Sequence, residues 1–187
     1  MNLFKDKDEI KNLVKRADNS TETKRLTKMF QQLKKERADF YLTQNELEEI
    51  LKWKLRSQYG RQKEQRKINT PKNIIAITQA AFAVTHKDKD VETTLKLKLL
   101  STLTGVEIPV ASAILTLCYP NKYSVIDFRN WRQVYKSDKT KTTYTTAEYT
   151  KYLNAIQEQA KKYGVTPQEI DIAIWQKDIE TNGTKTL

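Results

Sequence analysis

Apolar residues recur every three or four positions along most of the chain. Within 21–38, Leu26, Phe30 and Leu33 fall on one helical face, and Lys and Arg occupy the other positions. This period predicts an amphipathic helix. Comparable patterns predict helices over 8–17, 44–58, 90–103, 109–118, 128–135, 146–163 and 167–175, and one that starts at 71 and continues through 82. Because no stretch alternates apolar and polar residues as a half-buried strand does, the pattern predicts an all-α protein.

Residues that favour helix ends support these boundaries. Thr43 and Thr166 are each followed three residues later by Glu, which is the capping-box pattern of a helix start. Pro71 follows a Thr and suits the first helical position. We expect Gly60 to break the helix that begins after Thr43, and Gly105 to stop the helix over 90–103.

The apolar positions also predict which helices are buried. Within 90–103 we expect Val91, Leu95, Leu99 and Leu103 to face inward. The helix over 109–118 is apolar all round, as a fully buried helix is. The polar tract over 136–145 is expected to be a loop.

The charge of the chain narrows the class of partner. It has 34 Lys and Arg against 23 Asp and Glu, a formal net charge of +11. Eight of the basic residues and only one acid fall within 51–72. Such a cluster is typical of a protein that binds a polyanion, with nucleic acid as the first candidate. The alternative is a solvated basic surface without a ligand.

Aromatic residues are interleaved with the basic ones. Trp53 and Tyr59 lie within the basic cluster, and Trp131 lies between Arg129 and Arg132. Aromatic rings beside cations suit stacking on bases and binding of phosphates. Because tryptophan is highly buried on average, Trp53 and Trp131 are equally well explained as core residues of amphipathic helices.

Cysteine and histidine are too scarce for several kinds of chemistry. Cys118 is the only cysteine and lies in an apolar run, so we expect a small core residue and no disulfide. His86 is the only histidine, which excludes a multi-histidine metal site. We expect no metal and no cofactor. No apolar run approaches the roughly 20 residues of a membrane helix, and the N-terminus lacks a signal-peptide core, so we expect a cytoplasmic protein outside membranes.

Residues 103–127 contain the strongest candidate for chemistry. A turn at Gly105 joins two apolar helical runs, and Asp127 follows the apolar pair Val125-Ile126. Glycine lets a backbone approach a phosphate closely, and the start of the next helix favours an anion. An acid directly before a helix is also an ordinary N-cap, so position alone leaves both roles of Asp127 open.

The spacing of this stretch resembles the core of the helix-hairpin-helix DNA glycosylase superfamily. The family pattern is Leu-Pro-Gly-Val-Gly, then a pair of small residues that opens an apolar helix, then an apolar pair and Asp. Asp127 follows Gly105 by 22 positions, as in the family. The other matching positions are Leu103, Val106, Ala111, Ile114, Leu115, Val125 and Ile126, and the match covers about 40 residues well.

The resemblance implies both a fold and an activity. The fold is a single compact helical domain over 1–187 built around a helix-hairpin-helix motif, with a helical N-terminal extension over 1–40 packed on it. The activity is excision of a damaged or modified base that is flipped out of duplex DNA, as in base-excision repair. Asp127 would stabilise the positive charge that develops on the sugar as the N-glycosidic bond breaks.

Two positions depart from the family pattern. Glu107 replaces the second glycine of the hairpin, where an acid repels a phosphate unless it points away. Pro109 stands where members with lyase activity carry a lysine that forms a Schiff base. The resemblance therefore implies a monofunctional glycosylase.

Residue roles follow from the resemblance and the charge pattern together. We expect DNA contacts from Lys54, Arg56, Arg61, Lys63, Arg66, Lys67, Gly105, Val106, Arg129 and Arg132. We expect the base pocket to be lined by Trp53, Tyr59, Tyr123 and Trp131. The alternative, favoured by Glu107, is a module with a glycosylase-like fold that binds DNA without chemistry. An RNA-binding or protein-interaction helical domain is a third interpretation, and the pattern names no protein partner.

Overall fold

The computed structural model describes residues 2–17, 20–137 and 140–183. Within these ranges the chain is helical and contains no strand, as the hydrophobic pattern predicts. The α-helices are α1 (Lys7–Arg16), α2 (Ser20–Glu36), α3 (Gln44–Leu55), α4 (Pro71–Ala83), α5 (Lys89–Leu100), α6 (Ile108–Cys118), α7 (Phe128–Tyr135), α8 (Thr146–Tyr163) and α9 (Pro167–Asn182). Two 3-10 helices, η1 (Arg56–Gln62) and η2 (Gln65–Ile68), follow α3. The tract over 136–145 has no helix at its described positions, and 138–139 lie outside the described residues.

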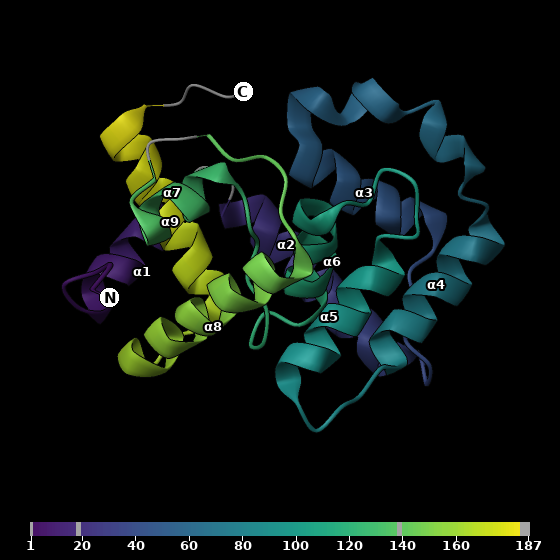
Figure 1. Ribbon diagram of the computed structural model, residues 1–187, viewed down its shortest axis with the longest axis horizontal. Helices are drawn as coiled ribbons and strands as arrows, with labels where there is room; N and C mark the ends of the chain where they lie inside the picture. The colour runs from purple at the N-terminus through teal and green to yellow at the C-terminus, as the bar shows by residue number, and fades with distance from the viewer. Residues whose placement is uncertain (1, 18–19, 138–139, 184–187) are drawn as a thin grey trace.

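The helices form two groups that lie side by side (Figure 1). Helices α2 to α6 pack on one another in the first group, and α1, α7 and α8 pack on α9 in the second. Contacts of α5 with α8 and of α1 with α2 join the groups. Helix α6 is the centre of the first group, because every residue from Val110 to Cys118 is buried. The prediction of a fully buried helix with Cys118 as a core residue is confirmed.

The first two helices are integral to this packing. Leu26 and Phe30 of α2 are fully buried in the same core as α6, and each such side chain stabilises the fold by about 1.5–3 kcal/mol. Helix α1 packs on α9, and the ion pair Arg16–Glu180 lies between them. The N-terminal segment therefore ties the two groups together.

The end of α3 differs from the prediction. The capping box at Thr43 is formed as expected, but the helix ends at Leu55 instead of continuing to Gly60. Arg56 has a positive φ of 48°, which turns the chain out of the α-helix. Gly60 lies inside η1 and does not end a helix, so it does not have the predicted role. After α3, the basic residues Arg56, Arg61, Lys63 and Lys67 are exposed, whereas Arg66 is buried.

The buried face of α5 also differs from the prediction. Val91 and Leu95 are 39% and 42% exposed, so the prediction that they face inward is wrong. Lys96 is buried in their place, and its Nζ donates hydrogen bonds to the carbonyls of Ala81, Phe82 and Val84. The C-terminal end of a helix leaves carbonyls unpaired, and a cation there satisfies them. Lys96 therefore joins α5 to the end of α4.

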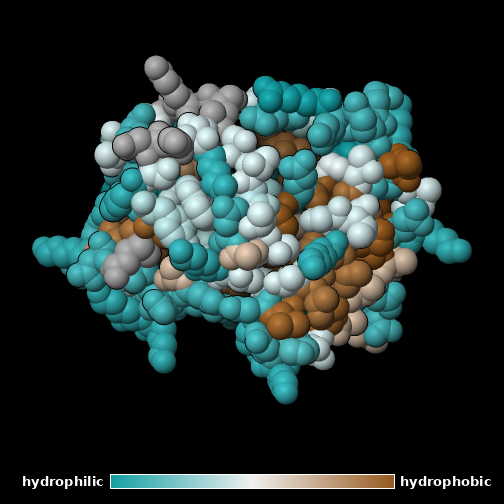
Figure 2. Space-filling model, in the orientation of Figure 1, coloured by the Kyte–Doolittle hydropathy of each residue, from teal (hydrophilic) through white to brown (hydrophobic). Residues whose placement is uncertain are grey.

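The surface shown in Figure 2 is hydrophilic over most of its area, with apolar side chains gathered over α5. Val91 and Leu95 are among the exposed large apolar residues of the described chain. Across the described residues, no helix combines the length and the apolar character needed to cross a membrane.

Candidate functional site

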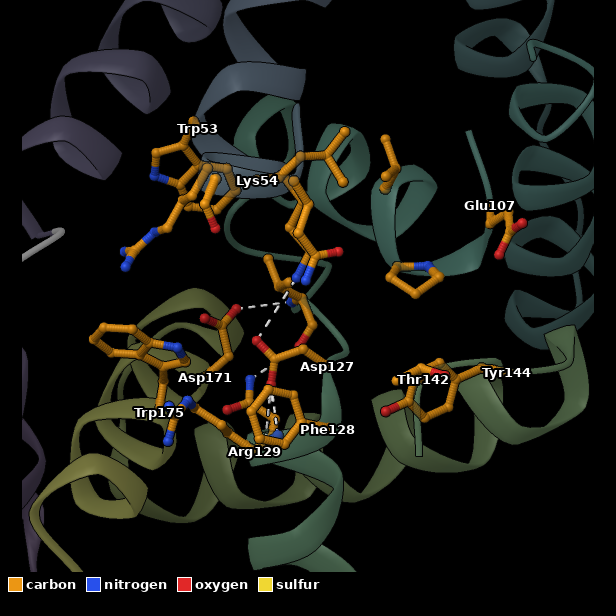
Figure 3. Close-up of a pocket in the computed structure, with 18 of the residues that line it drawn as sticks. Trp53, Lys54, Glu107, Asp127, Phe128, Arg129, Thr142, Tyr144, Asp171 and Trp175 are labelled. Carbon is orange, nitrogen blue, oxygen red and sulfur yellow. Dashed lines mark hydrogen bonds and ion pairs between the residues drawn. The ribbon is translucent and has the colours of Figure 1, made fainter. Parts of the chain in front are cut away.

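A cavity of about 630 Å³ lies between the two helix groups. This volume is within the range of small-molecule sites in proteins. One wall comes from the end of α3 and from η1, and the other from the starts of α6 and α7 and from α9. The polar and aromatic lining residues include Trp53, Lys54, Arg56, Arg61, Glu107, Asp127, Asn130, Tyr144, Asp171 and Trp175 (Figure 3).

Asp127 lines the cavity and begins α7. Its Oδ1 accepts hydrogen bonds of 3.0 Å from the backbone N–H groups of Arg129 and Asn130, so it is the N-cap of the helix. Its Oδ2 lies 3.7 Å from Nζ of Lys54. The N-cap bonds fix the direction of the carboxylate, while its second oxygen lies toward Lys54 within the site (Figure 3). The two roles of Asp127 that the sequence left open are therefore structurally compatible.

Side chains from three helices hold the extended segment that leads to Asp127. Ile126 N–H donates to Oγ of Ser112 on α6. The carbonyl of Val125 accepts from Nδ2 of Asn130 on α7 and from the hydroxyl of Tyr152 on α8. Because these backbone groups have no strand or helix partner, side chains must satisfy them. The result is an acid whose position is fixed before any ligand binds, which is what a preorganised site requires.

A second carboxyl group, Asp171 of α9, lines the same cavity. Its Oδ2 accepts a 2.8 Å hydrogen bond from Val125 N–H, and the residue is only 6% exposed. Burial raises the pKa of Asp171 well above its ordinary range, and the nearby charge of Asp127 raises it further. The hydrogen bond from Val125 and the charge of Lys54 lower the pKa only in part. Burial therefore favours the neutral form of the Asp171 carboxyl group.

Two tryptophans form the aromatic part of the cavity wall. Trp53 comes from α3 and Trp175 from α9, and Figure 3 shows both on the same side of the cavity as Asp171. Nε1 of Trp53 donates to Oγ1 of Thr23, and the guanidinium of Arg56 lies 5.2 Å from the ring centroid of Trp175. Flat rings in such a cavity suit a planar ligand.

Lys54 lies inside the cavity and not on the open surface, where a contact with a DNA phosphate would be expected. Its side chain is only 12% exposed and lies beside Asp127 in the cavity. The expected contact with the DNA backbone is therefore replaced by an ion pair inside the site.

The turn before α6 is closed over Arg66. Gly105 has a φ of +81°, and a Cβ at this position would lie 2.8 Å from Cγ of Arg66. Val106 N–H donates to the carbonyl of Leu103, and Val106 is buried. Arg66 is 5% exposed and donates from Nη2 to the carbonyl of Tyr59. Arg66 and Val106, for which the sequence predicts DNA contact, are both buried and pack at this turn.

The two arginines after Asp127 are also used internally. Nη1 of Arg129 lies 3.0 Å from Oδ2 of Asp178, and Nε of Arg132 lies 2.9 Å from Oδ1 of the same residue. Asp178 is completely buried on α9, and Arg129 is buried with it. These ion pairs hold α7 against α9, so both arginines, for which the sequence predicts DNA contact, are engaged inside the protein.

Four of the expected DNA contacts are exposed. Arg56, Arg61 and Lys63 lie on or directly after η1, and Lys67 lies on η2. Arg56 and Arg61 also line the cavity, so they form its basic edge. Glu107 is exposed and lines the same cavity, on the side away from Asp171 (Figure 3).

Of the four aromatics expected in the base pocket, only Trp53 lines this cavity. Tyr123 is buried in the core and packs edge-on against Tyr119. Trp131 packs on Tyr144 and on a neighbouring tyrosine of α7. Tyr59 donates to Glu48 and its ring contacts the guanidinium of Arg66, but Tyr59 itself does not line the cavity.

Sequence reasoning missed Asp171, Trp175 and Asn130. A signal for Asp171 is present, because it lies in the run Ile-Asp-Ile-Ala-Ile, and an acid among buried apolar residues requires a partner or a function. Trp175 follows on the same helix. Asn130 has no such signal, since its role depends on the position of Val125.

Within the described part of the chain, no three His, Cys, Asp or Glu side chains gather where they could hold a metal ion. Comparisons of the chain with protein-family models, with curated proteins and with solved structures give no match.

Proposed function

We propose that this protein is a monofunctional DNA glycosylase, which hydrolyses the N-glycosidic bond of a modified base flipped out of duplex DNA. The observation that carries the proposal is the placement of Asp127. Its carboxylate is fixed by the N-cap bonds on one oxygen and lines a cavity with two tryptophans and a basic edge.

The chemistry requires one carboxylate close to the sugar. Breaking the bond between C1′ and the base nitrogen builds positive charge on the sugar ring, and a fixed carboxylate stabilises that charge. Asp127 is suited to this role because its direction is set by α7 rather than by solvent. Water then adds to C1′ and leaves an abasic site.

The walls of the cavity support binding of a flipped base. A base that leaves the duplex loses its stacking, and aromatic side chains replace part of that energy, about 1–3 kcal/mol per base. Trp53 and Trp175 are the aromatic residues available for this purpose. Arg61 lines the cavity and Lys63 follows two residues later, and both exposed cations would contact the phosphates that flank the base.

Base release from a panel of duplexes tests the activity. Each duplex carries a single modified base, and released bases are identified by mass spectrometry. We expect abasic sites that break only after alkali is added, because Pro109 cannot form an imine and Lys54 is engaged by Asp127. Covalent trapping of the protein on DNA by borohydride would show lyase chemistry and contradict the monofunctional assignment.

A DNA-binding module without chemistry is the second candidate. Glu107 favours it, since an exposed acid beside the turn opposes phosphate binding and Lys54 already engages Asp127. This candidate predicts salt-sensitive DNA binding with no abasic product on any duplex. Salt-sensitive DNA binding without release of any base would therefore favour this candidate over the glycosylase.

A further inference from the structure

Asp127 and Asp171 are two carboxyl groups of the cavity lining that lie in different environments. Asp127 is fixed by two backbone N–H groups and lies beside Lys54. Asp171 accepts one backbone N–H and is otherwise enclosed by α9 and its neighbours. Figure 3 shows the side chain of Asp171 extending toward the segment that carries Asp127. Pairs of carboxyl groups whose surroundings differ in this way divide the work of acid and base between them.

We propose that Asp171 is the general acid of this site and gives its proton to a ring nitrogen of the departing base. The inference rests on the proposed glycosylase function. It adds the protonation of the departing base to the stabilisation of the sugar by Asp127. Asp127 faces the sugar, and Asp171 lies on the side of the cavity that holds the two tryptophans, where a stacked base would be bound.

The proton and electron balance is complete without any other reactant. The C1′–N bond breaks and its electron pair stays with the base, which takes the proton from the Asp171 carboxyl group. The sugar cation is stabilised by Asp127 and then bonded by a water oxygen. The proton that this water loses restores the acid form of Asp171, so the net reaction consumes only water.

The charged and titratable groups around Asp171 are consistent with this role. Lys54 of α3 and Asp127 at the start of α7 act on its carboxyl group, and Tyr149 and Tyr152 of α8 lie close enough to interact with it. Ser124 and Val125 supply hydrogen bonds. Burial is the largest influence on the pKa of Asp171, and it favours the neutral form of the carboxyl group.

A general acid also defines the class of base. A cationic base such as N7-methylguanine leaves as a neutral molecule and needs no proton. A neutral base such as hypoxanthine or uracil leaves poorly unless it is protonated, and a positioned acid accelerates that step by about 10²–10⁴-fold. The inference therefore assigns this protein to neutral modified bases.

Asp171→Asn separates the acid role from a positioning role. Asn keeps the side-chain oxygen that accepts from Val125 N–H but has no proton to transfer. Single-turnover rates on duplexes with one hypoxanthine, one uracil or one N7-methylguanine are measured for both proteins across a range of pH. The matched control is Glu180→Gln, the same chemical change on the exposed end of α9, away from the cavity.

We expect wild type to release a neutral base at a rate that falls as the pH rises and Asp171 loses its proton. Asp171→Asn should lower that rate by about 10²–10⁴-fold and remove the alkaline fall, whereas Glu180→Gln should leave both unchanged. A variant that retains the wild-type rate, or that loses rate equally at every pH, would overturn the acid role while leaving the glycosylase proposal intact. Release of N7-methylguanine alone would overturn it as well. If wild type releases no base from any duplex, the proposed function itself fails and this inference fails with it.

Discussion

Gly105 and Arg66 compete for the same small volume at the turn before α6. The positive φ of Gly105 excludes most side chains, and the stem of Arg66 fills the space that a Cβ would need. From the sequence, this glycine is explained by close approach of a phosphate. In the structure it is explained equally well by an arginine of the protein itself. A functional motif and a packing requirement therefore coincide at one residue.

Gly105→Ala should destabilise the protein by about 1–3 kcal/mol, because alanine meets both the backbone strain and the Arg66 stem. Urea unfolding measures the effect. Adding Arg66→Ala to Gly105→Ala should cost less than the sum of the two single changes, since the clash is gone. Additive effects would show that the two residues do not compete.

Asp171 makes stability depend on pH in a defined direction. Its pKa is raised in the folded state, so the folded protein holds a proton that the unfolded chain releases. The stability that this proton contributes is complete below about pH 4, the ordinary carboxyl pKa, and is lost as the pH rises through the raised value. Asp171→Asn removes this loss.

We therefore expect Asp171→Asn to gain stability relative to wild type as the pH increases above about 4. Thermal unfolding of both proteins over a series of pH values measures the difference. A constant difference at every pH would mean that the Asp171 carboxyl group has the same pKa in the folded protein as in the unfolded chain.

At the scale of elements, the helix starts at the capping boxes follow from local sequence, whereas the end of α3 and the buried face of α5 do not. The capping boxes at Thr43 and Thr166 form as their residue patterns predict. The predicted buried face of α5 is wrong, because Lys96 is buried there and is stabilised by carbonyls from the end of α4. Because that contact joins two helices, the spacing of apolar residues within α5 alone does not predict it.

Lys96→Met tests this connection between α4 and α5. Methionine keeps much of the apolar stem but leaves the three carbonyls unpaired, which should cost about 1–3 kcal/mol. Lys98→Met, an exposed change on the same helix, is the control and should change stability by less than about 0.5 kcal/mol. Equal effects of the two changes would contradict the capping role of Lys96.

For the candidate site, the sequence pattern indicates Asp127 and Trp53, which both line the cavity, but it does not reveal the ion pairs of two of the cations. Arg129 and Arg132 are matched to DNA by their position after the acid, yet both are bound to Asp178. Asp178 is about 50 residues away in sequence, so only the packing of α7 on α9 reveals the pairing. Residues that act locally were predictable, and residues whose partners come from distant elements were not.

At the scale of the whole molecule, exposed cations form one edge of the cavity. After the buried and paired cations are set aside, η1 and the residues around it still present Arg56, Arg61 and Lys63 to solvent. Charges on this edge would meet the DNA backbone first. The remaining basic residues are spread over the other helices.

The double change Arg61→Gln with Lys63→Gln should weaken binding of a DNA duplex and reduce the slope of log K against log salt by about 1 for each lost phosphate contact. The control is Lys151→Gln with Lys161→Gln, two exposed cations of α8 in the other helix group. Fluorescence anisotropy over a salt series measures both. Equal losses in the two double variants would show that only net charge matters.

Asp127→Asn gives the most direct test of the central claim, that Asp127 stabilises the charged sugar during base release. Asparagine retains the oxygen that caps α7 but carries no charge. The measurement is the single-turnover rate of base release from the duplex on which wild type is most active, with duplex affinity measured alongside. We expect the rate to fall by at least about 10²–10³-fold while affinity stays within a few-fold. Release at the wild-type rate by Asp127→Asn would contradict the claim.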